Sequence, residues 1–142
     1  MTAEQYLRQI RKLDAVIVNK LKDHRRWVEL AEGIGGFSVG ERVQASRNLH
    51  RGADAIGRYI DIESEINELR AQRNGIVAVI EELPPDEYQV IYKIYVEGYM
   101  LKELPSKFKR SYEWCKTRKK NGEAMIQEII DGDRANSSRD GF

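Results

Sequence analysis

The stretch YIDIESEINELRAQRNGIVAVIEEL, residues 59–83, decides the fold class of this 142-residue chain. Its apolar residues recur at alternating steps of three and four, which is the heptad spacing of a helix that packs along one seam. The seam positions are Tyr59, Ile62, Ile66, Leu69, Arg73, Ile76, Ile80 and Leu83, and Arg73 is the one charged residue among them. We therefore predict a long helix over residues 54–82 that buries this stripe against a second helix.

A second amphipathic segment precedes it, since residues 2–32 contain neither proline nor glycine. Its apolar stripe consists of Tyr6, Ile10, Leu13, Ile17, Leu21, Trp27, Val28 and Ala31. Thr2 fits the N-cap of this helix and Gly33 its end. Residues 33–53 hold five glycines and predict a flexible connector. We thus expect residues 1–82 to form a long antiparallel, coiled-coil-like helical hairpin that packs against the C-terminal module or a second chain.

The sequence after residue 82 predicts three shorter helices. Pro84 ends the long helix, and Pro85 fits the first position of a new one, which Gly98 ends. A short element follows over residues 100–108, then a turn over 109–111, and Ser111 fits the N-cap of a last helix ending near Ile130. This outline predicts a helix-turn-helix domain over residues 83–130. The polar residues 131–142 predict a disordered tail, and the whole chain is predicted to be all-α.

A net charge of +1 hides a basic segment, because residues 99–122 carry eight Lys or Arg against two Asp or Glu. In a helix-turn-helix the last helix lies in the major groove, and cations beside its N-terminus neutralise phosphates. We therefore predict that double-stranded DNA contacts Lys107, Lys109, Arg110, Ser111, Tyr112, Glu113, Lys116, Thr117 and Lys120. Tyr112, Glu113 and Lys116 would read the bases. The residues predicted to face inward are Cys115, Gly122, Met125, Ile126 and Ile129.

The residue types that metal sites and catalytic centres need are not grouped in the sequence. His24 and His50 have no second histidine or cysteine at ligand spacing, and Cys115, the one cysteine, has no histidine near it. We therefore predict no metal, no cofactor and no enzymatic activity. We find no secretory-signal pattern and no apolar run near the ~20 residues of a membrane span. These features predict a cytoplasmic protein with no membrane partner.

Residues 83–129, LPPDEYQVIYKIYVEGYMLKELPSKFKRSYEWCKTRKKNGEAMIQEI, resemble region four of bacterial sigma factors and their small phage relatives. The course of that region is LP…E…V…L.YVEG.S..EIA..L..S...V. The matching residues here are Leu83, Pro84, Glu87, Val90, Tyr95, Val96, Glu97, Gly98, Glu103, Leu104, Phe108 and Ser111.

The full layout is also similar to a family of uncharacterised small proteins of phages and prophages of Gram-positive bacteria. In that family a coiled-coil hairpin opens with YL.QI.KLD..I.NKL and a loop carries ERVQ.S. The matching residues are Tyr6, Leu7, Gln9, Ile10, Lys12, Leu13, Asp14, Ile17, Asn19, Lys20 and Leu21, then Glu41, Arg42, Val43, Gln44 and Ser46. The resemblance implies a phage or prophage transcription regulator, akin to late-gene activators. We expect its hairpin to form a homo-oligomer or to contact RNA polymerase.

Three residues depart from the region-four pattern. Met100 stands where Ser or Thr caps the first helix of the motif, Pro105 where a small residue is usual, and Lys109 where the turn has glycine. A proline that far into a short helix predicts a kink, which would disturb base reading more than backbone contact. Two alternatives stay open, a small terminase-like DNA-packaging component and a protein-interaction adaptor with a degenerate helix-turn-helix. A ring-shaped oligomer would favour the first, and protein binding without DNA affinity would favour the second.

Overall fold

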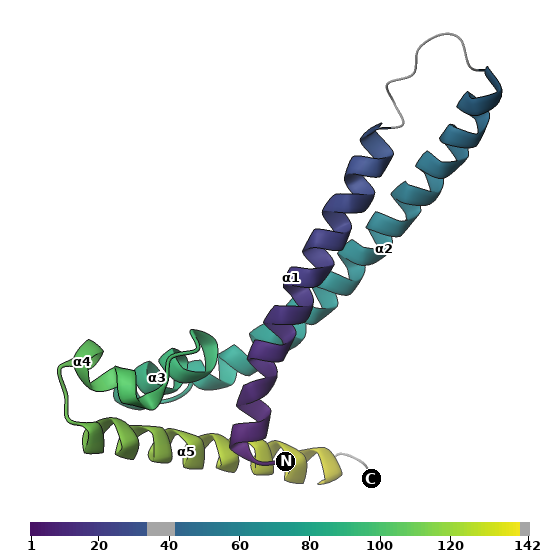
Figure 1. Cartoon of the computed structure of the whole chain (residues 1–142). Coiled ribbons are helices and arrows are strands. Elements are labelled where there is room, and N and C mark those ends of the chain that lie inside the picture. The colour runs from purple at the N-terminus through teal and green to yellow at the C-terminus, as the bar shows by residue number, and fades with distance from the viewer. Residues whose placement is uncertain (34–41, 140–142) are drawn as a thin grey trace. The chain divides into compact units, whose positions relative to one another are not determined.

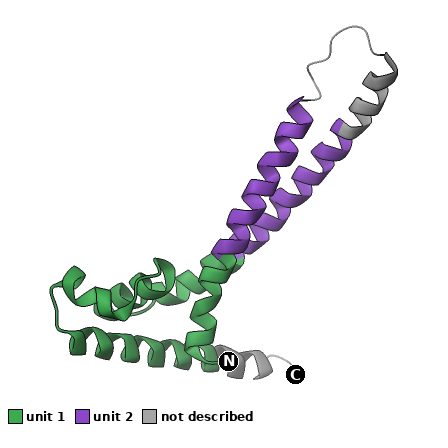
Figure 2. Cartoon of the chain, in the orientation of Figure 1, with its two compact units in different colours: residues 1–13, 72–142 green, residues 14–71 purple. Residues whose placement is uncertain are grey.

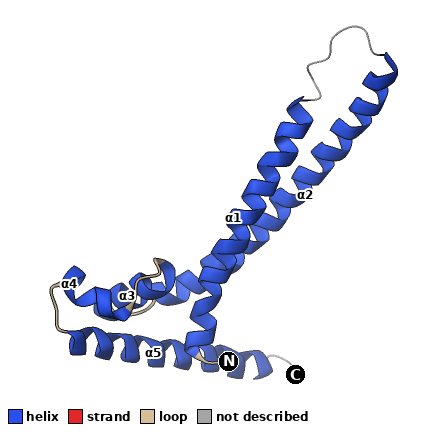
Figure 3. Ribbon diagram, in the orientation of Figure 1, coloured by secondary structure: helices blue, strands red, loops and turns tan. Residues whose placement is uncertain are grey.

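The computed structural model describes the backbone of residues 1–33 and 42–139, and the side chains of residues 1–33 and 52–132. All regular structure in these ranges is helical, which confirms the all-α prediction (Figures 1 and 3). The elements are α1 (Ala3–Gly33), α2 (Arg42–Glu81), α3 (Pro85–Ile91), the π-helical turn η1 (Tyr92–Val96), the 3-10 turn η2 (Leu101–Glu103), α4 (Leu104–Phe108) and α5 (Tyr112–Arg139). The described residues do not include the connector at 34–41 or the side chain of His50. Of the ERVQ.S stretch they include only the helical backbone from Arg42 onward.

The chain divides into two compact units (Figure 2). Unit 1 contains residues 1–13 and 72–142, and unit 2 contains residues 14–71. Both long helices therefore contribute to both units. The sequence-based division at residue 83 is a different partition and stays a prediction.

Unit 2 is built from α1 and α2 lying side by side (Figure 2). Its core consists of the buried Ile17, Ile62 and Ile66, with the partly buried Trp27 and Leu69 packed on them. The heptad seam of α2 is confirmed here, because its apolar positions are the ones that α1 covers.

The seam of α1 differs from the predicted stripe at Leu21, which is 41% exposed. The seam runs instead through Ile17, Lys20, His24 and Trp27, again at steps of three and four. Acidic residues of α2 satisfy its two polar members. Lys20 Nζ lies 2.7 Å from an oxygen of Glu65, and His24 Nε2 lies 2.8 Å from an oxygen of Glu63. Because Lys20 and His24 find these partners, the seam passes through them and leaves Leu21 at its side.

Unit 1 has a larger core that draws on every helix of the unit except α4. Its fully buried members are Leu7 and Ile10 of α1, Ile80 of α2, Ile91 of α3 and Ile126 of α5. The start of α1 is capped as predicted. Thr2 Oγ1 accepts a hydrogen bond from the backbone N–H of Gln5 at 3.1 Å, and the Gln5 side chain accepts one from the Thr2 N–H at 3.0 Å. This reciprocal pair satisfies two donors that a helix end otherwise leaves unpaired.

Two helix boundaries lie beyond the predicted ones. α2 begins at Arg42, inside the segment predicted as a flexible connector, because residues 42–51 contain no glycine or proline that would stop a helix. α5 continues past Ile130 to Arg139, inside the segment predicted as a disordered tail. Its polar residues 131–139 also contain no proline, and Gly132 is their one strong helix-weakening residue. Residues 140–142 lie outside the described part of the tail.

Gly98 ends the helical segment that begins with α3, as predicted. The last turn widens to π geometry, in which the N–H of Glu97 bonds the carbonyl of Tyr92 at 3.1 Å. Gly98 then takes φ +86, a left-handed conformation that favours glycine. A Cβ at this position would lie 1.8 Å from Nη1 of Arg11, an exposed side chain that can move aside, so the backbone conformation is what favours glycine there.

Candidate nucleic-acid interface

Helices α3, α4 and α5 enclose a small core of their own in unit 1. Its buried members are Val90, Leu104 and Cys115, which contribute one residue from each helix. Phe108 and Trp114 close one side with an edge-on ring contact at 6.3 Å between centroids. Cys115 faces inward, as the sequence predicted, and its burial raises the pKa of the thiol.

The close approach of α3 and α5 depends on Gly122, which is buried as predicted. A Cβ there would lie 2.6 Å from Cγ1 of Ile91, nearer than two carbon atoms normally pack. Nearby, Arg118 of α5 donates a hydrogen bond of 2.7 Å to Glu87 of α3, whose side chain is 6% exposed. This ion pair fixes α5 on α3, and it commits the Arg118 guanidinium to the fold.

The turn between α4 and α5 is tight and specific. Lys109 takes φ 54 and ψ 43, the left-handed conformation for which the related pattern has glycine. The N–H of Arg110 then bonds the carbonyl of Pro105 at 3.2 Å, which closes the end of α4. Ser111 Oγ accepts a hydrogen bond from the N–H of Trp114 at 3.1 Å, so Ser111 is the predicted N-cap of α5.

The other two departures from the region-four pattern are accommodated locally. The N–H of Glu103, from which a Ser or Thr side chain at position 100 would accept a hydrogen bond, bonds the Met100 carbonyl at 2.9 Å instead. The Glu103 carboxylate in turn accepts a hydrogen bond from the Met100 N–H at 3.3 Å. The kink at Pro105 stays a prediction, and the helix type changes directly before this residue. A 3-10 turn ends at Glu103 and α4 begins at Leu104, so Pro105 falls in the first turn of a new helix, where its missing N–H costs no helical bond.

All the residues that the sequence predicted to contact DNA are exposed, and they follow one another from α4 through the turn onto α5. They are Lys107, Lys109, Arg110, Ser111, Tyr112, Glu113, Lys116, Thr117 and Lys120. The cations among them, together with Lys102 of η2, make no ion pair with any described residue. We call Lys102, Lys107, Lys109, Arg110, Lys116 and Lys120 the basic surface. The sequence places Lys102 in the basic segment but does not assign it to the DNA contact, because no pattern shows which side of the short element over residues 100–108 faces outward.

Two members of the basic surface are held by aromatic rings. Lys107 Nζ lies 4.2 Å from the ring centroid of Tyr99, and Arg110 Cζ lies 5.1 Å from that of Trp114. Such contacts orient a cation while its charge stays available to an anion. The turn therefore presents two positioned cations beside the N-terminus of α5, where backbone N–H groups also favour phosphate.

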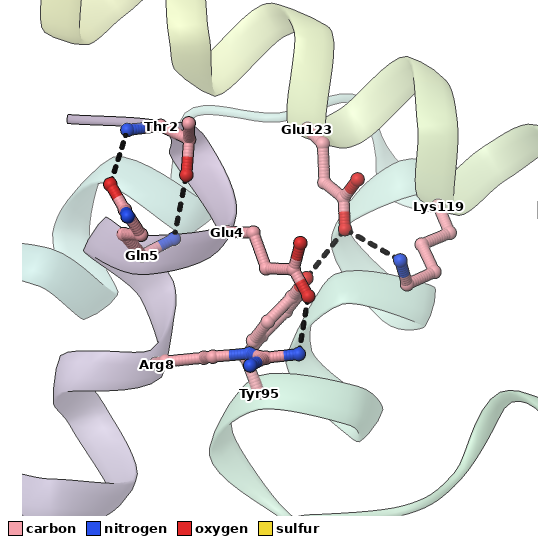
Figure 4. A network of polar contacts seen from close by, with 7 residues as sticks. All are labelled: Thr2, Glu4, Gln5, Arg8, Tyr95, Lys119 and Glu123. Atoms are coloured by element: carbon pink, nitrogen blue, oxygen red, sulfur yellow. Dashed lines mark hydrogen bonds and ion pairs between the residues drawn. The ribbon is translucent and has the colours of Figure 1, made fainter.

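The remaining cation of the segment, Lys119, belongs to a polar network within unit 1 (Figure 4). Glu123 lies 2.8 Å from Lys119 Nζ and accepts a hydrogen bond of 2.5 Å from the hydroxyl of Tyr95. Burial and this hydrogen bond raise the pKa of Tyr95. Beside the network, Arg8 pairs with Glu4 on α1. Lys119 and Arg118 are thus structural, whereas the basic surface is free of such ties among the described residues.

Comparison with known proteins finds no matching family model, no matching curated protein and no matching solved structure. None of the described helices is long and apolar enough to cross a membrane. The described side chains contain no group of three or more His, Cys, Asp or Glu that could hold a metal ion.

Proposed function

We propose that this chain is a DNA-binding transcription regulator in which α4, the turn at Lys109 and α5 act as a helix-turn-helix. In this proposal α1 and α2 form a helical hairpin, α5 enters the major groove, and η2 with α4 crosses the DNA backbone. RNA polymerase as a protein partner rests on the resemblance to region four, and the phage or prophage origin rests on the resemblance to the family of small phage and prophage proteins.

The observation that carries the proposal is the basic surface. Its cations are exposed and without ion-pair partners among the described residues, while the cations of the same segment that face the fold are neutralised by Glu87 and Glu123. A face of α5 that served solubility alone would have no need to separate its charges in this way. Unpaired cations grouped at a helix N-terminus are the feature that binds phosphate most directly.

The exposed residues divide by their expected roles. Lys107, Lys109 and Arg110 would contact phosphates beside the groove, since they directly precede the start of α5. Lys102 would contact the DNA backbone that η2 and α4 cross. Tyr112, Glu113, Lys116, Thr117 and Lys120 would face the groove itself, since they form the outer face of the first turns of α5. A carboxylate such as that of Glu113 is repelled by phosphate, but it accepts a hydrogen bond from the cytosine amino group.

The test is a fluorescence-anisotropy titration of labelled duplex DNA across a series of salt concentrations. We expect micromolar or tighter binding that weakens steeply with salt. Lys107→Ala and Arg110→Ala should each weaken binding and lower the slope of log K against log salt by about one, as the loss of one phosphate contact does. Lys116→Ala should also weaken binding, mainly to the preferred sequence, because Lys116 faces the groove.

The matched control is Lys12→Ala, because Lys12 is equally exposed but lies on α1. It should leave both affinity and slope unchanged. Absence of binding at low salt would refute the proposal and favour a protein-interaction adaptor. Equal loss in the control and the test variants would refute the assignment of the surface.

A further inference from the structure

Unit 2 has a second apolar surface besides the one that α1 and α2 bury against each other. Val18 and Leu21 of α1 are 49% and 41% exposed, and Ile56 and Ile60 of α2 are 43% and 52% exposed. Large apolar side chains scattered singly need no explanation, but a contiguous set of them marks an interaction surface.

These four side chains lie on one side of the helix pair. Leu21 lines a groove with Glu63, Asn67 and Arg70 of α2, and it lines the adjoining groove with Val18 and Arg25 of α1. Ile60 precedes Glu63 by three residues and Asn67 by seven, and Ile56 precedes Ile60 by four, so helical periodicity puts them on the same flank of α2. We call this surface the outer face. Its members are Val18, Leu21, Arg25, Val28, Ile56, Ile60, Glu63, Asn67 and Arg70.

The outer face repeats the spacing of a packed seam on both helices. On α1 its residues follow steps of three, four and three, and on α2 they follow steps of four, three, four and three. A helix that carries two heptad stripes has a partner for each of them, as in a four-helix bundle. Within unit 2, α1 and α2 use one stripe each on one another. The second stripe is exposed except at Val28, which is partly buried.

We propose that a second copy of this chain covers the outer face, so that two copies of unit 2 form a four-helix bundle. The copies would be related by a two-fold axis that runs along the helices, which sets α1 of one copy antiparallel to α2 of the other. The pairs His24–Glu63 and Lys20–Glu65 within one chain show which residues of α1 and α2 lie at the same height along this axis.

At these heights the two stripes interleave. Val28 is level with the interval between Ile56 and Ile60 of the second copy, Arg25 with that between Ile60 and Glu63, Leu21 with that between Glu63 and Asn67, and Val18 with that between Asn67 and Arg70. Each contact occurs twice because the interface is isologous. The match places a cation against an anion at the centre of the face and apolar side chains against each other at one end, which is the charge complementarity that favours this occupant.

The test is the molar mass in solution by sedimentation equilibrium over a range of concentrations. We expect the parent chain to have twice its chain mass of 16.5 kDa. Ile60→Lys should raise the dimer dissociation constant by at least about tenfold, because it puts a cation into the centre of an apolar contact. Leu30→Lys is the matched control, since Leu30 is 47% exposed in the same unit but lines a separate groove with Trp27. It should leave the dimer intact.

A charge exchange tests the orientation. Arg25→Glu and Glu63→Arg should each weaken the dimer, because each sets like charges beside one another. Glu63→Arg also removes the pair with His24, so the decisive comparison is Arg25→Glu against the double variant, which should bind more tightly. Far-ultraviolet circular dichroism will show that the helices persist, as expected for substitutions of exposed residues. A monomeric parent, equal dissociation by Leu30→Lys, or a double variant no tighter than Arg25→Glu would overturn the proposal. None of these outcomes depends on DNA binding.

Discussion

Alanine at Gly122 should destabilise the fold, although alanine normally stabilises a helix. The added Cβ would lie 2.6 Å from Cγ1 and 3.1 Å from Cδ1 of Ile91, a side chain that is fully buried between α3 and α5. Overpacking of a core costs about 1–3 kcal/mol, and replacing a glycine within a helix recovers about 1 kcal/mol. Because the contact is short and Ile91 has no open space to enter, we expect a net loss of about 1–2 kcal/mol.

The matched control is Gly75→Ala on α2, where an added Cβ would have no atom within 4 Å. This change should stabilise the chain by about 0.5–1 kcal/mol through helix propensity alone. Urea unfolding followed by circular dichroism measures both values. The two variants should differ in sign, and in thermal melts each kcal/mol should shift the midpoint by about 2–4 °C.

A background variant separates packing from any other effect at this position. In Ile91→Ala the clashing atoms are absent, so the added Gly122→Ala change should become neutral or stabilising. If Gly122→Ala stabilises the parent chain as Gly75→Ala does, α3 and α5 do not approach as closely as described, and the geometry of the basic surface fails with it.

Three further predictions concern the turn and the helix pair. Lys109→Gly should raise the free energy of unfolding by up to about 1 kcal/mol, because glycine takes the left-handed conformation without strain. It should also weaken DNA binding by removing a cation, so the urea midpoint should rise while the DNA affinity measured by anisotropy falls. Ser111→Ala should lower the free energy of unfolding by about 1 kcal/mol through loss of the α5 cap, and an unchanged urea midpoint would contradict the capping role. The hydrogen bond from Lys20 lowers the pKa of Glu65, so this pair adds stability that is present at neutral pH and is lost as the pH falls through the folded-state pKa. Glu65→Gln should therefore make the free energy of unfolding depend less on pH on the acid side, and an unaltered pH dependence would argue against the pair.

Much of the fold follows from periodicity and end signals in the sequence. The heptad seam of α2 identified its buried face, and the caps at Thr2 and Ser111 fixed the starts of α1 and α5. These features are local, so the residues that produce them are neighbours in the chain. The outward face of α5 can also be predicted from the sequence, because helical periodicity alone puts Lys116 on one surface with residues three and four positions away.

What the sequence did not reveal depends on partners that are distant in the chain. Leu21 looked like a core residue, but Lys20 and His24 occupy the seam because Glu65 and Glu63 of α2 pair with them. The sequence likewise does not separate the structural cations of α5 from the unpaired ones, since nothing local marks Arg118 as the partner of the buried Glu87.

Helix lengths were underestimated for a different reason. The starts and ends of helices were inferred from glycine and polar composition, which weaken a helix without stopping it. The extra turns of α2 before residue 54 and of α5 after Ile130 contain no proline, which is the residue that would have ended them.

The most direct test of the central claim is to map the DNA contact on the protein by NMR. Amide chemical shifts of the labelled full chain would be followed while an unlabelled duplex is added at low salt. The account predicts that the largest shifts fall in residues 102–120, around the turn at Lys109 and the exposed face of α5. Shifts confined to residues 14–71, or no shifts at all, would contradict it and would leave the basic surface without a nucleic-acid role.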